Sequence, residues 1–538
     1  MISVLICPSS PARDCRIIGS IRSYRLTGGR VVAQAASVAR SRISTVFFRI
    51  IISQSCLSPS IKASRTIDAI PLSLFFRIGF LDRVLAKRPI EAYWVDIREA
   101  RMAKIQARIL RGFRDYLPAD MIPRRAMFSK VEDVFRIHGF APLLTPALEY
   151  SECLLGKYGD EGDKLLYRFE DNGGRDIALR YDLTVPLARM VAMNGGLTLP
   201  FKRYQIAPVW RAEKPGRGRF REFFQCDADI IGAAGPDAEV EILSVGVGIL
   251  KALHVGGFTI SMNHRGVFDG LLAGIGVEDP EKKAEVIRTL DKLDKIGQDR
   301  VMEILASEVG LPASSLERIA EFLSLEDGDL DAAKTFFDGD EVAIAALDSM
   351  ASTLSLAQEM GIGDHLEVRL SIARGLDYYT GLIYETTLTA LPDIGSVMSG
   401  GRYDGLMSMF GAPAHAAVGI SLGVDRLYAA LLELEEIERK ESPTEVLVTV
   451  FDEESRTAAF QFTHALRAAG VAAEVHLGNT KKFGKQFRYA DKKQIPYVAI
   501  LGPDERAEGK VRIRTLADGS EQLLSNAEAI QTLASTSS

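Results

Sequence analysis

The most regular pattern of hydrophobic and polar positions lies in residues 201–232. Side chains of strand character alternate with polar ones over residues 201–210, and a second, mostly apolar run covers residues 223–231. The segment between the two runs contains Gly216 and Gly218. Two strand-like runs around a glycine-containing loop predict a long antiparallel hairpin.

The chain before this hairpin carries one helical pattern and one proline-rich strand pattern. Residues 120–138 repeat apolar side chains at helical spacing, and Gly139 follows as a helix end. The apolar residues expected on one side of this helix are Ile122, Ala126, Phe128, Val131, Val134 and Phe135. Residues 140–150 predict a strand, which its prolines Pro142 and Pro146 confine to a sheet edge or an interface.

Residues 165–184 predict a second, shorter hairpin around an Asn-Gly-Gly turn. Alternation along its returning strand places Arg180, Asp182 and Thr184 on one face, where a charge pair and a hydroxyl would meet. An exposed ion pair on a surface strand is the alternative interpretation of these residues.

Helical and strand patterns follow each other after the central hairpin. Residues 236–253 have the period of an amphipathic helix, and residues 258–264 that of a strand. Residues 277–362 are charged and helically periodic throughout, and strands resume in residues 366–388. The pattern therefore predicts an antiparallel sheet interrupted by a helical insertion.

A different pattern begins after a Ser-Pro linker at residues 441–444. Buried strands alternate with helices, which predicts a small α/β domain with a largely parallel sheet. One of its helices interleaves cations at helical spacing with aromatic residues: Lys481, Lys485, Arg488, Lys492, Phe483, Phe487 and Tyr489. Such a helix is suited to RNA, and a solvated charged face explains it equally well.

Composition separates the first part of the chain from the rest. The net charge of the 538 residues is −6, yet residues 1–101 hold 16 Lys and Arg against 6 Asp and Glu. The Arg-rich, Ser-rich, acid-poor stretch up to Thr66 has the composition of an organelle transit peptide. A translated upstream segment before a natural start at Met102 is the alternative, and we favour it. The remaining chain is acidic, so any nucleic acid must bind to local basic patches.

The cysteines and histidines exclude several classes of protein. Five cysteines form no Cys-x-x-Cys pair and seven histidines form no close cluster, so we expect no disulfide framework and no metal held by side chains. The apolar runs are too short to span a membrane. A cytoplasmic location is therefore expected, or an organellar one if residues 1–101 are a transit peptide.

Arginines supply the candidate chemistry. Arg211 ends the first strand of the central hairpin, and a basic loop follows it. Guanidinium groups match phosphate oxygens in pairs, so this hairpin is suited to a polyphosphate; a solvated surface turn is the alternative. Arg426 begins an apolar helix after two glycines and could reach a nucleotide, with a helix-start salt bridge as the alternative. No P-loop or dinucleotide fingerprint is present, so ATP would lie on the antiparallel sheet.

Several stretches together resemble one family. VWRAE with GRFREFFQCDADIIG resembles motif 2 of the class II aminoacyl-tRNA synthetases, VGISLGVDRL resembles motif 3, and the strand ending at Pro146 resembles the dimer-forming motif 1. ARGLDYY at residues 373–379 and SGGRYDGL at residues 399–406 are similar to stretches specific to histidyl-tRNA synthetases. The resemblance covers residues 108 to about 525.

This resemblance implies an α+β fold, and together with the composition of the first part of the chain it gives five regions. They are a basic extension (1–101), the first part of the catalytic domain (102–276), a helical insertion (277–362), the second part of the catalytic domain (363–438) and an anticodon-binding domain (444–538). The sheet core would be antiparallel and flanked by helices, and the C-terminal domain α/β.

The resemblance also implies roles for individual residues. Arg211 would hold the α-phosphate of ATP, with Glu213 in the same site and Arg426 beside the adenine and the γ-phosphate. Arg374 would stand near the α-phosphate, where other class II enzymes place a metal, and is implied as catalytic together with Arg211. The residues matched to histidine binding are Asp182, Thr184, Gln225, Asp229, Arg374, Tyr378 and Tyr379.

Within that set, Asp182 and Thr184 match positions that hold the amino group, and Gln225 belongs to the same site. Asp229 and Tyr379 match residues that recognise the imidazole, with Tyr378 beside them. Several family members carry Glu at position 229, and Asp is shorter. The implied reaction joins histidine to tRNA(His) through a histidyl-adenylate, with ATP accompanied by Mg²⁺ and with the protein as a homodimer.

Two other functions are compatible with parts of the pattern. One is a catalytically silent relative that binds histidine as a regulator, such as the regulatory subunit of ATP phosphoribosyltransferase. The other is a tRNA-sensing module of a larger regulator. The intact motif arginines and the C-terminal domain favour the enzyme over the first, and the absence of kinase motifs disfavours the second.

Overall fold

The computed structural model describes residues 30–32, 51–53, 106–373, 378–478 and 482–536. The chain divides into two compact units, Met1–Arg108 and Ile109–Ser538. In the first unit, the described residues form an antiparallel pair of strands, β1 (Arg30–Val32) and β2 (Ile51–Ser53). The rest of the predicted extension lies outside the described residues, and so does Arg374.

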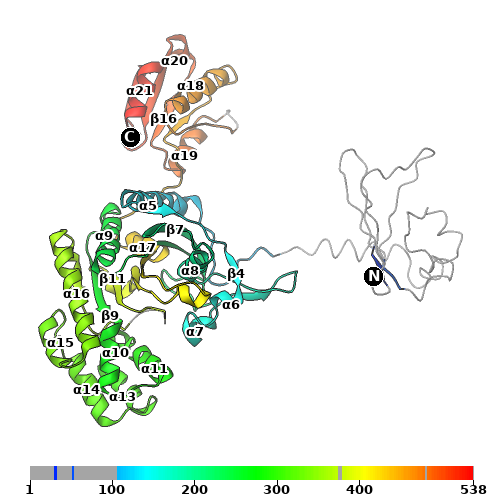
Figure 1. Ribbon diagram of the computed structural model, residues 1–538. Helices are drawn as coiled ribbons and strands as arrows, with labels where there is room; N and C mark the ends of the chain where they lie inside the picture. Colours follow the sequence, from blue (N-terminus) through cyan, green and yellow to red (C-terminus); the bar gives the residue numbers. More distant parts are fainter. Residues whose placement is uncertain (1–29, 33–50, 54–105, 374–377, 479–481, 537–538) are drawn as a thin grey trace. The chain divides into compact units, whose positions relative to one another are not determined.

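An eight-stranded sheet forms the centre of the described second unit (Figure 1). Its strands, in spatial order, are β10 (Leu366–Val368), β9 (Phe258–His264), β11 (Leu382–Leu388), β12 (Met398–Arg402), β13 (Ala417–Gly423), β8 (Glu222–Ile231), β7 (Phe201–Trp210) and β3 (Ala141–Pro142). The pairs β10–β9 and β3–β7 at the two edges are parallel, and the pairs between them are antiparallel. The predicted central hairpin is confirmed as β7–β8.

Helices cover one face of this sheet and bury its even-numbered β8 side chains. They include α5 (Pro118–Ile137), α9 (Pro236–Ala252), α10 (Arg265–Gly274), α16 (Glu341–Glu359) and α17 (Val424–Glu433). Cys226, Ala228 and Ile230 of β8 belong to the large hydrophobic core formed with these helices. Alternation along the strand therefore turns Gln225 and its odd-numbered neighbours towards the other face.

The opposite face carries a second, smaller core. Its buried residues come in part from α8 (Thr184–Met193), β6 (Asp176–Leu179) and the short helix α6 (Ser151–Leu154). Strand β6 pairs with β4 (Leu148–Tyr150) and β5 (Arg168–Glu170) in a three-stranded sheet, and the short helix α7 (Gly159–Asp163) follows α6. Tyr378 and Tyr403 contribute buried aromatic rings to this core. The odd-numbered side chains of β8 thus lie between the sheet and a second packed layer.

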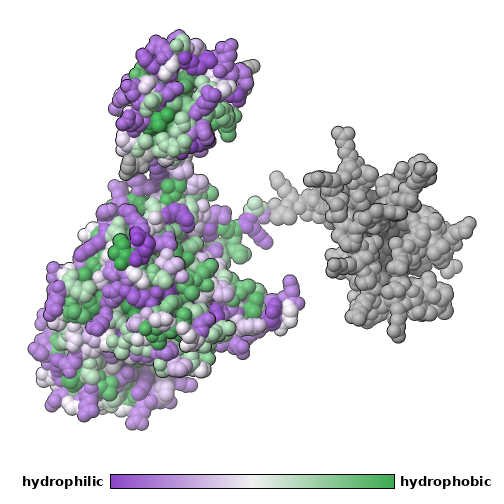
Figure 2. Space-filling view, turned by 45° about the horizontal axis from the view of Figure 1, so that its top comes forward, coloured by the Kyte–Doolittle hydropathy of each residue, from purple (hydrophilic) through white to green (hydrophobic). Residues whose placement is uncertain are grey.

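Further helices connect β9 and β10 in the region predicted as helical. They are α11 (Pro280–Leu290), α12 (Leu293–Ile296), α13 (Gln298–Ser307), α14 (Ala313–Leu323) and α15 (Leu330–Phe336), followed by α16. The remaining short elements are the 3₁₀ turns η2 (Gly363–His365), η3 (Pro392–Ile394) and η4 (Met407–Phe410). Hydrophilic residues dominate the visible surface, with apolar ones scattered among them (Figure 2).

The C-terminal part forms a five-stranded sheet with helices. Its elements are β14 (Val446–Val448), α18 (Arg456–Ala468), β15 (Ala473–Val475), α19 (Gly484–Lys492), β16 (Tyr497–Ile500), α20 (Pro503–Ala507), β17 (Lys510–Thr515), β18 (Glu521–Ser525) and α21 (Asn526–Thr536). Strands β15, β14 and β16 are parallel, and β17 and β18 continue the sheet antiparallel. The predicted α/β pattern is confirmed.

The structure corrects three local predictions. On α5, Ala126 is exposed, and the buried face includes Arg124 because its guanidinium has an acidic partner in the core. Residues 140–150 do not form one strand: β3 lies at the edge of the large sheet and β4 in the three-stranded sheet. Thr184 is the first residue of α8 rather than a strand residue.

The third correction has a local cause. The returning strand ends at Leu179, and the Oδ1 atom of Asp182 accepts a hydrogen bond from the backbone N–H of Val185, 3.0 Å away. A carboxylate that accepts from a first-turn N–H stabilises the start of a helix. This contact favours α8 over a continued strand, so Arg180, Asp182 and Thr184 do not share a strand face.

Candidate functional site

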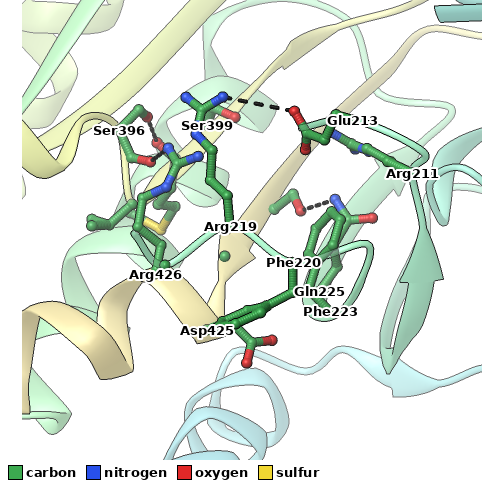
Figure 3. Close-up of a pocket in the computed structure, with 15 residues that line it drawn as sticks. Arg211, Glu213, Arg219, Phe220, Phe223, Gln225, Ser396, Ser399, Asp425 and Arg426 are labelled. Atoms are coloured by element: carbon green, nitrogen blue, oxygen red, sulfur yellow. Dashed lines mark hydrogen bonds and ion pairs between the residues drawn. The ribbon is translucent and has the colours of Figure 1, made fainter. Parts of the chain in front are cut away.

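A cavity of about 290 Å³ opens on the face of the large sheet where β8 and β13 lie side by side (Figure 3). Its walls come from the β7–β8 hairpin and loop, the segment leading into β12, the end of β13 and the start of α17. The lining residues are Arg211, Glu213, Gly218, Arg219, Phe220, Phe223, Gln225, Ser396, Val397, Met398, Ser399, Ser421, Gly423, Asp425 and Arg426. Predicted site residues from two distant motifs therefore meet in one cavity.

The cavity is rich in guanidinium groups. Arg211 donates through Nε to the carbonyl oxygen of Tyr181 at 3.1 Å, and its guanidinium lies 4.2 Å from the ring centre of that tyrosine. Arg219 pairs with Glu213 at 3.7 Å, and Arg426 donates to the carbonyl oxygen of Ser396. Figure 3 shows Arg211 with Glu213 on one side, Arg426 on the other and Arg219 between them. Three cations around one cavity suit a polyphosphate.

Gly218 brings the hairpin loop close to the start of α17. This glycine has φ +63°, and a Cβ atom there would lie 3.1 Å from the Cα atom of Arg426. Both the left-handed backbone and the close approach favour glycine at this position. The loop and Arg426 are consequently held together at the cavity wall.

Asp182 is a buried acidic group that interacts with Arg211 of the cavity wall. It is 2% exposed and accepts hydrogen bonds from the hydroxyls of Tyr158 at 3.0 Å and Tyr378 at 3.1 Å. Burial raises the pKa of this carboxyl, and the Val185 N–H, Arg211 and the two tyrosines oppose the rise. The Thr184 hydroxyl hydrogen-bonds to Tyr378, and the ring of Tyr379 lies 5.0 Å from that of Tyr378.

Asp229 forms a second buried acidic group on β8. Its Oδ2 atom lies 2.6 Å from the Nη2 of Arg203, and its Oδ1 atom accepts from the hydroxyl of Tyr403. Burial raises the pKa of Asp229, while Arg203 lowers it. Gly419 lies opposite on β13, where a Cβ would come within 2.0 Å of Asp229 Oδ1. Glycine at this position leaves room for the carboxylate above the sheet.

Gln225 connects this acidic region to the cavity. Its Nε2 atom donates to Ser421 Oγ at 2.7 Å, and both residues line the cavity wall. Most of the predicted residues thus lie along one continuous surface of the sheet. The structure places Arg211, Glu213, Gln225 and Arg426 at the cavity, and Asp182, Thr184, Asp229, Tyr378 and Tyr379 in the buried acidic region.

The sequence prediction missed residues that complete the acidic region: Tyr158, Arg203, Asp227 and Tyr403. A signal existed for two of them. Arg203 and Asp227 are charged residues at interior positions of the two strands of the central hairpin, where a buried charge requires a partner. Tyr403 lies inside the stretch of residues 399–406, but its role depends on a partner 174 positions away.

A network beneath the cavity holds the start of α17. Asp425 accepts hydrogen bonds from Tyr116 and from Arg124 at 2.6 Å, and its Oδ2 accepts from the Phe224 N–H at 2.9 Å. The guanidinium of Arg124 also lies 3.9 Å from the ring centre of Tyr116. Segments from three parts of the chain therefore fix the residue that directly precedes Arg426.

We expect Tyr116→Phe to lower the free energy of unfolding by about 1–3 kcal/mol, because it removes one donor from a buried carboxylate. Equilibrium urea denaturation measures this difference. Ser307→Ala, which removes an exposed hydroxyl at the end of α13, is the control and should change stability by less than about 0.5 kcal/mol. Equal stability of the two variants would contradict a structural role for the Tyr116 hydroxyl.

The C-terminal α/β part carries the predicted combination of cations and aromatic rings on and around α19. Lys485, Arg488 and Lys492 are exposed on α19, and the ring of Phe483 lies 5.4 Å from that of Phe451 and 5.3 Å from that of Phe487. Lys481 lies outside the described residues. Among the residues that the structure covers, no helix is long and apolar enough to cross a membrane.

Comparison with known proteins identifies the class and then the family. An anticodon binding domain profile matches residues 445–536. With the guanidinium-lined cavity on an antiparallel sheet, this defines an aminoacyl-tRNA synthetase. The profile of histidyl-tRNA synthetase matches residues 112–427, which is more than half of the chain. The chain belongs to the histidyl-tRNA synthetase family, whose members are ligases.

Individual relatives agree with this assignment. A histidine–tRNA ligase from Rhodopirellula baltica is 44% identical over 424 residues, covering 78% of this chain and 95% of the relative. One from Aeropyrum pernix is 41% identical, covering 80% and 98%. The crystal structure of histidyl-tRNA synthetase from Nostoc sp. PCC 7120 matches with a TM-score of 0.71 at 28% identity, covering 80% of this chain and 100% of that chain. These matches confirm the predicted family, fold class and enzyme class.

One solved structure bears on the regulatory alternative. It is described as an ATP phosphoribosyltransferase regulatory subunit/histidyl-tRNA synthetase from Bacillus halodurans, with a TM-score of 0.63 and 23% identity, covering 74% of this chain and 98% of that chain. At this identity the likeness concerns the fold alone. The identity to the ligases is much higher, which favours the enzyme.

Proposed function

We propose that this protein attaches histidine to tRNA(His) at the expense of ATP, through a histidyl-adenylate. The observation that carries the proposal is the continuity of two kinds of surface on one sheet face. A cavity with three guanidinium groups adjoins a buried acidic region, and Gln225 hydrogen-bonds to Ser421 at their junction. The cations suit ATP, and the carboxylates suit a substrate with an ammonium group and an imidazole ring.

ATP is the substrate that family membership implies, and the cavity offers it matched groups. Arg211 would hold the α-phosphate, and its contact with Tyr181 between the cavity and Asp182 supports this role. Arg426, which lines the opposite wall, would lie beside the adenine and the γ-phosphate. Phe220 and Phe223 add apolar surface for the planar base.

Histidine would lie over the acidic region. Asp182, Thr184 and Gln225 would bind its amino group, and Asp229, Tyr378 and Tyr379 its imidazole. An oxygen of the histidine carboxylate then attacks the α-phosphorus, the bond to the bridging oxygen breaks, and pyrophosphate leaves. This step depends on alignment and charge neutralisation, which Arg211 and Arg374 would supply. A hydroxyl of the 3′-terminal ribose next attacks the acyl carbon and releases AMP.

Mg²⁺ would enter with the β- and γ-phosphates of ATP. In the described chain, no group of three or more His, Cys, Asp or Glu side chains is arranged to hold a metal ion. Mg²⁺ is commonly bound by one or two carboxylates together with substrate phosphates. Glu213 and Asp425 line the cavity, but their carboxylates pair with Arg219 and Arg124, so the substrate phosphates would hold the ion. The ion would neutralise charge on the leaving pyrophosphate.

A homodimer formed near the motif 1 segment is part of the proposal. Leu144, Leu148, Tyr150 and Phe169 are between 44% and 77% exposed. Such large apolar side chains grouped around β4 and β5 suit burial against a second copy. The C-terminal domain, with its exposed cations and aromatic rings, would bind the anticodon arm of the tRNA.

Amino-acid-dependent ATP–pyrophosphate exchange tests the proposed reaction on the full chain. Exchange should appear with histidine and stay at background with the other amino acids, and it should be lost in Arg374→Ala. A folded protein that binds histidine but gives no exchange would instead support the regulatory function. Analytical ultracentrifugation tests the dimer, and a monomer at micromolar concentration would contradict it.

A further inference from the structure

Asp227 is a buried acidic residue that none of the roles above uses. It lies in the middle of β8, between Gln225 and Asp229, and is 2% exposed. Its cross-strand neighbours are Ser421 on β13 and Gln205 on β7. Alternation turns its side chain to the same sheet face as the two neighbouring site residues, between the cavity wall and the second packed layer.

Its carboxylate is incompletely satisfied. Within the described part of the chain, Asp227 Oδ1 is buried and has no hydrogen-bond partner, although the carboxyl bonds to Ser421. Gln225 Oε1, two residues earlier on the same face, is likewise buried without a donor. Leaving a buried acceptor unpaired is unfavourable, and more so for a charged group. Two such acceptors side by side indicate that a donor from outside the chain completes the site.

The nearest cation does not fulfil this need. Arg203 directs its Nη2 to Asp229 at 2.6 Å and to the carbonyl oxygen of Leu183 at 3.2 Å. Burial raises the pKa of Asp227 to about 7; Arg203 opposes the rise, and Asp229 and Asp182 add to it. Arg180 and Arg211 also act on Asp227 and Asp182, yet no described donor reaches the Oδ1 atom of Asp227, and a cationic ligand with an N–H group could supply one.

The substrate offers two kinds of donor, and the geometry selects one. The imidazole end is assigned to Asp229, whose oxygens already meet Arg203 and Tyr403. The buried acceptors of β8 without a hydrogen bond in the described chain are Gln225 Oε1, Asp227 Oδ1 and Asp229 Oδ2, and the last of these has Arg203 Nη2 as its charged neighbour at 2.6 Å. Gln225 lines the cavity, and Asp227 lies between Gln225 and Asp229 on the same strand face, so these two acceptors stand on the side where the amino acid's reacting carboxylate must meet ATP. An ammonium group carries three N–H donors on one atom, so it can satisfy several acceptors at once.

We propose that Asp227 is a further histidine-binding residue, whose Oδ1 accepts a hydrogen bond from the α-ammonium group of the substrate. This inference rests on the proposed function, because it assigns a role within the same amino-acid site. It also explains why a carboxylate is retained at a buried position where an apolar residue would pack without unpaired atoms.

Asp227→Asn tests the proposal, because it removes the charge at nearly constant size. In ATP–pyrophosphate exchange with the full chain, we expect the KM for histidine to rise by roughly 10- to 100-fold, as for one charge-assisted hydrogen bond, with the KM for ATP unchanged. Cys226→Ala is the matched control, since Cys226 is the adjacent residue but packs into the helix-covered core. It should leave the KM for histidine within about twofold.

Two inhibitors distinguish the ammonium group from the ring. Histidinol keeps both, and imidazolepropionate lacks the ammonium. We expect Asp227→Asn to weaken inhibition by histidinol by the same factor by which it raises the KM for histidine. Inhibition by imidazolepropionate should stay unchanged. If inhibition by imidazolepropionate were weakened by the same factor as inhibition by histidinol, the assignment to the ammonium group would be overturned. Asp227→Ser, which removes the carboxylate without adding N–H donors, gives the same readouts if the amide variant fails to fold.

The failures of the two proposals differ. An active wild type whose Asp227→Asn variant keeps its KM for histidine would overturn the role of Asp227 alone. A wild type without histidine-dependent exchange would overturn the proposed function, whatever the variant does.

Discussion

Arg211→Gln is expected to lower kcat for histidine-dependent ATP–pyrophosphate exchange by roughly 10³-fold, the loss typical when a preorganised donor to developing charge is removed. Arg211 is held in place before any substrate binds, by the Tyr181 carbonyl oxygen and by the rings of Tyr181 and Phe223 at 4.2 and 5.2 Å. Glutamine keeps one N–H donor group but carries no charge, so the α-phosphate would lose its neutralising partner in the transition state.

The control is another arginine of the same hairpin loop. Arg217 pairs with Glu433 at the surface, and both side chains are 47% exposed. Because Arg217 does not line the cavity, Arg217→Gln should keep exchange within about threefold of wild type, since the assay contains no tRNA. If Arg211→Gln retained more than a tenth of the wild-type kcat, the placement of Arg211 at the α-phosphate would be wrong.

The largest effect on stability is expected at Arg203. Its side chain is fully buried and its guanidinium is 2.6 Å from Asp229. Removing one partner of a buried ion pair leaves the other charge uncompensated, which costs about 3–5 kcal/mol. We therefore expect Arg203→Leu to lower the free energy of unfolding by that amount near pH 8, as measured by urea denaturation.

The loss should depend on pH in a defined direction. The pKa of Asp227 is about 7 in the folded protein against a usual 3.8, so the wild type loses stability from this group as the pH rises from about 4 to about 7. Arg203 lowers the pKa values of Asp227 and Asp229 and so limits this loss. Without Arg203 both carboxyls stay protonated to higher pH, and the destabilisation should be smaller at pH 5 than at pH 8.

An exposed ion pair provides the comparison. Arg168 and Asp176 bridge β5 and β6 with side chains 49% and 51% exposed. Exposed pairs contribute little, so Arg168→Leu should lower stability by less than about 1 kcal/mol at either pH. A similar small loss in Arg203→Leu, or a loss that grows towards pH 5, would contradict the buried-charge explanation.

Local patterns predicted the elements that carry the site. Alternation and glycines identified the β7–β8 hairpin, and helical spacing identified α5 and α9, because these periods follow from the backbone geometry of each element. The motif arginines Arg211 and Arg426 were also found in the sequence, and the cavity includes both. The proline-rich segment was assigned correctly to a sheet edge, although it does not continue as one strand.

The sequence by itself thus determined the family, the succession of strands and helices, and the residue types available for ATP and histidine. Only the tertiary structure decided which buried groups meet. Tyr116 reaches Asp425 across 309 positions and Tyr403 reaches Asp229 across 174, contacts that no local period encodes. Thr184 lies in a helix and not in the predicted strand, because Asp182 accepts a hydrogen bond from the Val185 N–H. The proposed role of Asp227 in histidine binding depends on its unpaired oxygen, and which buried atoms remain unpaired is decided by the arrangement of the whole chain.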